Sequence, residues 1–222
     1  MRPGLYGVLQ SGLLRLDGVD LSGRRRMLGL VVPGEPVGDP TGGAAPESRL
    51  TAVLDARICR FSAEPAGRLT DCAPEFRHAV LRAFSARLAR LQTMMWMQAM
   101  LGTTDRIAAL LMMASRFMPT RRLEGDGVRI HFVMPRQDAA DMIATTTESI
   151  SRATHELERN GLIGIRDPAT FDVFDLARLA ERASLDAATL DSLFPHAVGD
   201  GVAAAHHPAD APEAAPRPRA RS

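Results

Sequence analysis

An apolar stripe in the middle of this 222-residue chain constrains its fold more than any other feature. The members of the stripe are Val80, Phe84, Leu88, Leu91 and Met95. Their spacings of three and four residues predict one face of an α-helix of about seven turns. Pro74 and Glu75 suit its first turn, with Asp71 as a capping residue, and we expect the helix to span 74–101. So long an apolar face packs against its own domain, as a core helix, against a second copy in a parallel dimer, or against both.

The composition excludes several classes of protein. Hydrophobic residues make up 45% of the chain and charged residues 24%, which is typical of a globular protein. No apolar run approaches the ~20 residues of a membrane span, and the first residues lack a secretory signal, so we expect a cytoplasmic protein without membrane partners. Cys59 and Cys72 are the only cysteines, too few for a cysteine-only metal cluster or a disulfide framework.

The segment before the long helix is predicted to form short antiparallel strands. Glycine and proline interrupt its apolar runs, and a Gly/Pro-rich loop covers 34–46. The predicted strands are 5–9, 13–16, 27–32 and 50–61. Strands of this length and spacing favour a small barrel or roll over residues 1–73, which makes the fold class α+β.

The segment after the long helix is predicted to contain a helix-turn-helix. A first helix at 136–143 and a second at 147–160 are separated by Ala144, Thr145 and Thr146. Strands at 162–165 and 171–174 would form a hairpin wing, completing a domain over 103–176. A helical extension is expected at 177–198, followed by a disordered Ala/Pro-rich tail at 199–222.

The second helix of this unit carries polar side chains that suit base recognition. Glu148, Ser151, Arg152 and His155 fall on its outer face. Arg152 can donate to guanine and Glu148 can accept from cytosine. Thr145, Thr146 and Thr147, with the free amides of the helix start, can hold phosphates. The alternative is a surface ion pair between Glu148 and Arg152, which the helix-turn-helix spacing makes less attractive.

These residues resemble those of the CRP/FNR transcriptional regulators. The segment 148–152 is similar to the E-x-x-S-R signature of the FNR-type recognition helix. The resemblance implies an inverted repeat of TTGAT-like half-sites in double-stranded DNA, read by Glu148, Ser151 and Arg152, with Arg136 on a phosphate. The family's recognition unit has Gly where this chain has Ala144, a position that costs Ala roughly 1–2 kcal/mol if it must be left-handed.

The resemblance extends over residues 5–183 and implies the rest of the architecture. Residues 1–73 resemble the later strands of the family's cyclic-nucleotide-binding-like β-roll, without its first strands. The stripe at 80–95 falls on the family's dimerisation helix, which favours the homodimer over the core-helix reading. The implied function is a transcription regulator, in the family more often an activator, that contacts RNA polymerase. The alternative is a truncated, signal-blind member that binds DNA constitutively or poorly.

The signal and the cofactor stay unassigned. By resemblance, Asp39 and Arg49 are the candidate ligand-binding residues, but Leu50 stands where a Ser or Thr hydroxyl would hold a cyclic phosphate, which makes a cyclic nucleotide doubtful. An iron–sulfur cluster is not expected, because the family's ligand cysteines lie mainly ahead of the segment resembling 5–9, and Cys59 falls on a core strand. We find no catalytic residues and no metal-ligand spacing, so we do not expect an enzyme.

Overall fold

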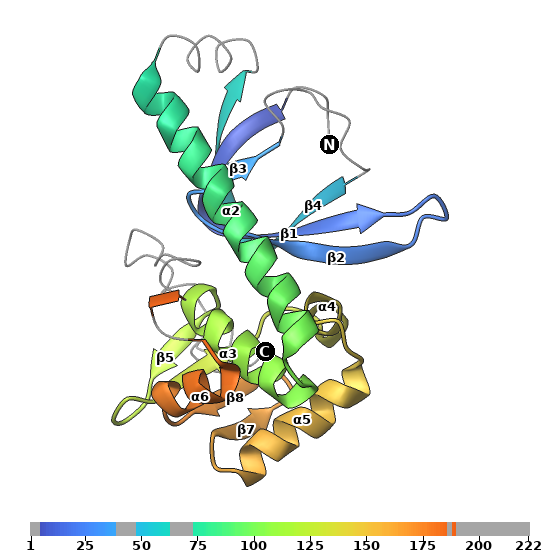
Figure 1. Ribbon diagram of the computed structural model, residues 1–222, viewed down its shortest axis with the longest axis vertical. Helices are drawn as coiled ribbons and strands as arrows, with labels where there is room; N and C mark the ends of the chain where they lie inside the picture. The colour runs from blue at the N-terminus through green and yellow to red at the C-terminus, as the bar shows by residue number, and fades with distance from the viewer. Residues whose placement is uncertain (1–4, 39–47, 63–72, 186–187, 190–222) are drawn as a thin grey trace, which may run out of the picture.

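A computed structural model describes residues 5–38, 48–62, 73–185 and 188–189. Two antiparallel sheets lie at opposite ends of one long helix, which crosses the front of the molecule in Figure 1. In the part of the chain that the structure describes, the shorter helices cluster with the second sheet, so the chain is α+β as expected. In the described part, no helix is long and apolar enough to cross a membrane.

The first sheet corresponds to the predicted roll. Its strands are β1 (Leu5–Val19), β2 (Arg25–Val31), β3 (Pro36–Val37) and β4 (Ser48–Ser62). β1 pairs antiparallel with all three others, so it is the central strand. A small apolar cluster fills the inside of this sheet, formed by Leu9, Leu14, Val31 and Val37.

The predicted division of this segment into strands 5–9 and 13–16 is wrong, because β1 is one strand rather than two. Gly12 has φ +90°, and a Cβ there would collide with the carbonyl oxygen of Asp55 on the paired strand. The register between β1 and β4 shifts on both sides of this residue. Glycine therefore produces an irregularity within a continuous strand instead of ending it.

The long helix α2 spans Pro74–Met100 and joins the two sheets. Pro74 takes the first turn as expected, but the N-cap is Ala73, with no side-chain hydrogen bond. Asp71, the expected capping residue, lies outside the described residues. Only Arg90 and Met97 of this helix are buried, so one side of α2 faces the body of the molecule.

The second sheet belongs to a winged helix-turn-helix. Its strand order is β5-β6-β8-β7. The elements are α3 (Thr103–Phe117), β5 (Thr120–Arg122), β6 (Val128–His131), α4 (Arg136–Met142), α5 (Thr147–Arg159), β7 (Ile163–Asp167), β8 (Thr170–Val173) and α6 (Leu176–Ala183). α3 lies at the centre of the core, with an unbroken buried run from Ile107 to Ala114.

The two ends of the molecule share a boundary. Leu13, Met27 and Val32 of the first sheet belong to the same buried cluster as α3 and α4. Beside them lies a buried ion cluster: Arg15 pairs with Asp17 at 3.0 Å and with Asp138 of α4. The first sheet therefore holds the helix-turn-helix by both apolar and charged contacts.

Candidate nucleic-acid interface

The turn between α4 and α5 fixes the angle of the helix-turn-helix. Ala144 has φ 51°, so it adopts the left-handed conformation in which an alanine, unlike the glycine of the family, costs free energy. Arg106 of α3 supports this turn, since its guanidinium donates to the carbonyl oxygens of Ile143 and Ala144 at 3.0 and 3.1 Å. The same side chain donates to the carbonyl of Leu101, at the end of α2, at 2.9 Å.

The inner face of α5 anchors it to the core. Ile150 and Leu157 are buried, and Ala153 lies with them. Thr154 is also buried, and its hydroxyl donates to the carbonyl of Ile150 at 3.0 Å. This anchoring leaves the opposite face of α5 free for contacts outside the chain.

The outer face of α5 carries the predicted base-reading residues together. Glu148, Arg152 and His155 are exposed and Ser151 is half-buried. The Arg152 guanidinium donates to the hydroxyl of Ser149 at 3.2 Å. Ser149 was not among the predicted residues, although its place one turn before Arg152 was readable from the sequence.

Glu148 is held as a charged acceptor at the start of α5. Hydrogen bonding to its own backbone amide, above all, and to the hydroxyls of Thr146 and Thr147 lowers the pKa of its carboxyl below the usual range. A carboxylate at a helix N-terminus is further favoured by the helix dipole. At neutral pH this group accepts hydrogen bonds and cannot donate them.

The three threonines lie at the start of α5, although not in equal roles. Thr146 is the N-cap, and its hydroxyl accepts from the amide of Ser149 at 3.2 Å. Its side chain is exposed, whereas Thr145 and Thr147 are half-buried. All three hydroxyls lie at the N-terminus of α5, where the helix dipole favours a phosphate oxygen.

Side chains from both helices of the helix-turn-helix hold the wing, and one of them, Glu158, was not among the predicted residues. Glu158 of α5 accepts from the amide of Ile165 on β7 at 3.1 Å. Arg136, expected on a phosphate, donates to the carbonyl of Pro168 at the tip of the wing at 3.3 Å. Arg136 and Pro168 are 32 residues apart in the sequence, and Glu158 and Ile165 lie on different elements, so the periodicity of a single helix or strand indicates neither contact.

A buried carboxylate organises the wing sheet from within. Asp172 of β8 accepts from Arg129 at 2.6 and 3.0 Å and from Arg166 at 2.6 Å. The hydrogen bonds from Arg129, and then those from Arg166, hold the pKa of Asp172 below its usual range. The three residues lie on neighbouring strands, and together they fix the position of the wing.

The candidate ligand residues are not brought together by the described part of the structure. Arg49 is exposed on β4, opposite Asp17 in the register of β1. Asp39 and Cys72 lie outside the described residues, and Cys59, expected in the core, is half-buried with a free thiol. Among the residues that the structure describes, no group of three His, Cys, Asp or Glu side chains is arranged to hold a metal ion.

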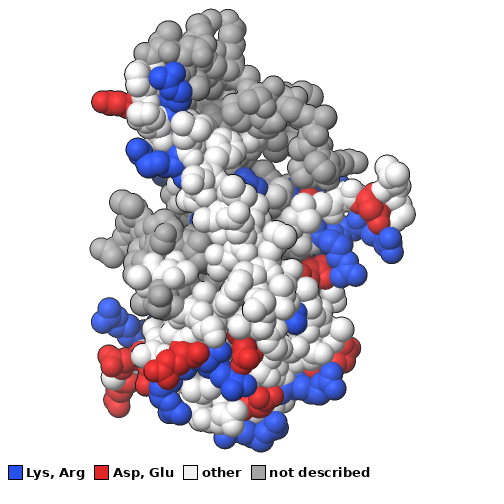
Figure 2. All heavy atoms as spheres, viewed as in Figure 1, with Lys and Arg blue, Asp and Glu red and all other residues white. Residues whose placement is uncertain are grey.

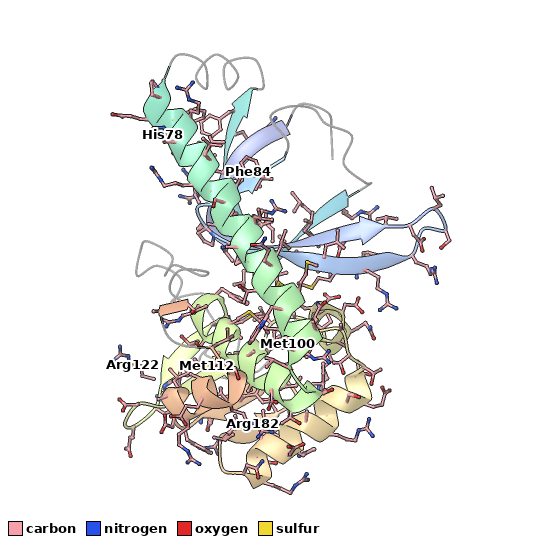
Figure 3. All side chains as sticks on the ribbon, in the orientation of Figure 1. His78, Phe84, Met100, Met112, Arg122 and Arg182 are labelled. Atoms are coloured by element: carbon pink, nitrogen blue, oxygen red, sulfur yellow. The ribbon has the colours of Figure 1, made fainter. Side chains whose placement is uncertain are left out.

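Charge is concentrated around the winged helix-turn-helix. Figure 2 shows basic and acidic side chains interleaved over the lower domain, whereas the strip along α2 is mostly uncharged. Part of this charge is internal pairing, as between Arg182 of α6 and Asp105 of α3 at 2.6 Å, with Arg182 labelled in Figure 3.

Comparisons with known proteins agree with this architecture. The model of the Crp-like helix-turn-helix domain matches residues 105–182. The chain is 28% identical to the transcriptional activator protein FnrL of Cereibacter sphaeroides, over 79% of this chain and 71% of FnrL. It is 29% identical to the nitrogen fixation regulation protein FixK of Bradyrhizobium diazoefficiens, over 72% of this chain and 66% of FixK.

The solved structures give the same result for the fold. The crystal structure of a CRP/FNR-family transcriptional regulator from Thermus thermophilus matches with a TM-score of 0.66 and 25% identity. The match covers 82% of this chain and 89% of that one, so it includes both sheets and the helix between them. Residues 105–182 are a Crp-like helix-turn-helix domain that contains the α4–α5 unit, and the chain as a whole is similar to transcriptional regulators of the CRP/FNR family.

Proposed function

We propose that this regulator binds, as a homodimer, an inverted repeat of TTGAT-like half-sites and controls transcription from it. The observation that carries the proposal is the outer face of α5, where Glu148, Ser151 and Arg152 lie free of the core. An exposed guanidinium and a charged carboxylate four residues apart suit adjacent guanine and cytosine edges in the major groove.

The exposed side of α2 supports the homodimer. Leu88 is 56% exposed and Met95 is 68% exposed, and Phe84 and Leu91 also lie in solvent, while Val80 is half-buried. Figure 3 shows α2 with Phe84 along its length and Met100 at its lower end. Large apolar side chains at heptad-like spacing on an otherwise uncharged strip are typical of a coiled-coil seam.

A dimer that pairs through α2 would let its two recognition helices contact two half-sites at once. Two helix-turn-helix units related by a two-fold axis read half-sites about 34 Å apart, one turn of DNA. Because two relatives are named as activators, we further propose that the output is activation through contact with RNA polymerase.

Fluorescence anisotropy tests the DNA-binding proposal. The full chain is titrated onto a duplex with TTGAT and ATCAA half-sites separated by four base pairs, and onto a duplex in which the G·C pairs of both half-sites are changed. We expect Arg152→Ala to lose about 1–3 kcal/mol of binding free energy on the first duplex and little on the second. All titrations use one stated salt concentration, because phosphate contacts make the affinity salt-dependent.

Arg178→Ala serves as the matched control, since Arg178 is exposed on α6, away from the outer face of α5. It should bind the first duplex like the unchanged chain. Equal affinity of the unchanged chain for both duplexes would contradict sequence-specific reading. Equal losses in Arg152→Ala and Arg178→Ala would show that Arg152 acts only through its charge.

A further inference from the structure

A cavity of about 300 Å³ lies where the first sheet, α2 and the helix-turn-helix domain meet. Leu28 and Leu30 of β2 line one wall, and Arg87, Arg90 and Met94 of α2 line another. Met113 and Phe117 of α3 and Met142 of α4 complete it from the winged helix-turn-helix domain. Its volume falls at the lower end of the range for small-molecule sites, roughly 300–1,000 Å³.

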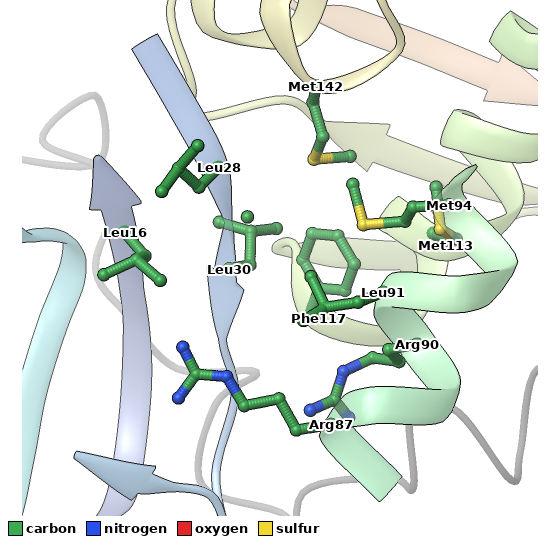
Figure 4. A pocket seen from close by; sticks show the side chains of 11 residues that line it. Leu16, Leu28, Leu30, Arg87, Arg90, Leu91, Met94, Met113, Phe117 and Met142 are labelled. Atoms are coloured by element: carbon green, nitrogen blue, oxygen red, sulfur yellow. The ribbon is translucent and has the colours of Figure 1, made fainter. Parts of the chain in front are cut away.

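The cavity is apolar at one end and cationic at the other. Figure 4 shows Met94, Met113 and Met142 close together at one end, with Arg87 and Arg90 at the opposite end. Methionine side chains are flexible and polarisable, so they adapt to apolar bodies of different shape. An occupant of this cavity would therefore be apolar along most of its length.

The two arginines differ in how their charge is compensated. Arg90 is buried and forms an ion pair with Glu35. Arg87 has a single hydrogen bond within the described residues, to the carbonyl oxygen of Pro36 at 3.4 Å, and no acidic partner there. Burial lowers the pKa of Arg87, which shows that its surroundings disfavour the charge. A partly desolvated cation without a carboxylate is best satisfied by an anion.

We propose that this cavity binds a small organic acid with an apolar body, its carboxylate on Arg87 and its body among the three methionines. The site is separate from the ligand residues expected from the sequence, since Arg49 does not line it. Its walls come from both domains, so an occupant contacts the first sheet and α4 at once. Binding at this site is measured without DNA, and its failure leaves the DNA-binding proposal untouched.

Octanoate and 1-octanol are suitable probes, because they share an apolar body and differ in the charged group. Isothermal titration calorimetry on the full chain should show one octanoate bound per chain, and weaker binding of 1-octanol. Arg87→Gln should weaken the binding of octanoate about tenfold, the smaller end of the effect of a charged hydrogen bond. The same substitution should leave the affinity for 1-octanol within twofold of the unchanged chain. Arg82→Gln, an exposed position on the same helix, should change neither.

A second variant tests the cavity itself. Gly29 lies on the wall of the cavity, and a Cβ there would meet only a Leu91 methyl carbon at 3.9 Å. The side chain of Gly29→Val therefore fills part of the cavity without a backbone clash. This variant should weaken both probes, with an unchanged circular dichroism spectrum. Absent or non-saturable octanoate binding overturns the proposal. Octanoate binding would be absent, for example, if a second copy of the chain filled the cavity. The proposal is also overturned if octanoate and 1-octanol bind equally, or if both variants leave octanoate binding unchanged.

Discussion

Ala144 holds the tightest turn of the recognition unit in a conformation that suits glycine. Its φ of 51° places it in the left-handed region, where an L side chain costs roughly 1–2 kcal/mol. Replacing it with glycine removes that strain but adds freedom to the unfolded chain, a penalty of about 0.5–1 kcal/mol. We therefore expect Ala144→Gly to raise the free energy of unfolding by about 0.5–1 kcal/mol, measured by urea denaturation.

The matched control for this substitution is an alanine in a regular helix. Ala79 is exposed on α2, and Ala79→Gly should lower the free energy of unfolding by about 1 kcal/mol. If the two substitutions shift the urea midpoint in the same direction, the turn at Ala144 is not strained.

Asp172 makes the wing sensitive to acid. The hydrogen bonds from Arg129 and then Arg166 lower its pKa in the folded chain, whereas an unfolded Asp titrates near ~3.9. Its stabilisation is therefore fully present above that pH and is lost as the pH falls through the lower, folded value. Asp172→Asn should cost about 1–3 kcal/mol at pH 7, and the cost should shrink below about pH 4.

Urea denaturation of both proteins between pH 7 and pH 3 measures this difference. Asp126→Asn is the control, because Asp126 is exposed in the turn between β5 and β6 and should change the stability by less than ~0.5 kcal/mol. A cost of Asp172→Asn that stays constant with pH would show that the loss is one of packing, not of charge.

The sequence predicted some of these residues and not others for a physical reason. The outer face of α5 follows from helical spacing alone, so Glu148, Ser151 and Arg152 were placed correctly on it. Arg106 and Asp172 act through partners 37 and 43 residues away, and no local pattern shows such contacts. Arg106 is also one of 27 basic residues in this chain, so its type alone does not single it out.

The contact between β1 and α4 joins the two domains through buried charge. Arg15 lies between Asp17 and Asp138, and all three side chains are buried. Burial, above all, raises the pKa of Asp17 even though Arg15 stands beside it. Arg15→Ala would remove the closest cation from two buried carboxylates and leave Arg25 at 3.4 and 3.9 Å, with Arg49 opposite Asp17 on β4. We expect a loss of about 3–5 kcal/mol in the free energy of unfolding.

Arg26 offers a more exposed pair at the same boundary for comparison: the Asp141 carboxylate is 8% exposed, but it also accepts a hydrogen bond from Gln137. Arg26 bonds Asp141 of α4 at 2.6 Å, but its side chain is 74% exposed. Arg26→Ala should therefore cost at most about 1 kcal/mol. Both variants are compared by thermal unfolding followed by circular dichroism. Similar costs for the two would mean that the burial of Arg15 adds nothing to the connection between the domains.

The helices and strands could be predicted from the sequence better than the contacts between them. Long helical periodicity identified α2 and the pair α4–α5, since each has an apolar face that repeats along the helix. The segment of the first sheet was correctly predicted to form strands, but β1 was wrongly divided into two near Gly12. A glycine in a strand can mark either a turn or an irregularity within the strand. The cluster of Arg15 with Asp138 was beyond reach, because it joins residues 123 positions apart.

In the proposed homodimer, the exposed side of α2 sets how the two recognition helices meet DNA. One recognition helix reads a single half-site, so an inverted repeat requires two copies held at a fixed separation. Leu88 lies in the middle of the apolar stripe and is more than half exposed in the single chain. A glutamate there would bring two like charges together at a two-fold seam and remove apolar contact from both copies.

We expect Leu88→Glu to convert a dimer into a monomer at micromolar concentration, as measured by sedimentation velocity. The loss of one recognition helix from each complex should then reduce the affinity for the inverted repeat to that for a single half-site. Ala89→Glu adds the same charge one residue further along α2, at an exposed position off the stripe, and should stay dimeric. If the unchanged chain sediments as a monomer, or if Leu88→Glu remains a dimer, the stripe is not the seam, and its exposed side chains require another partner.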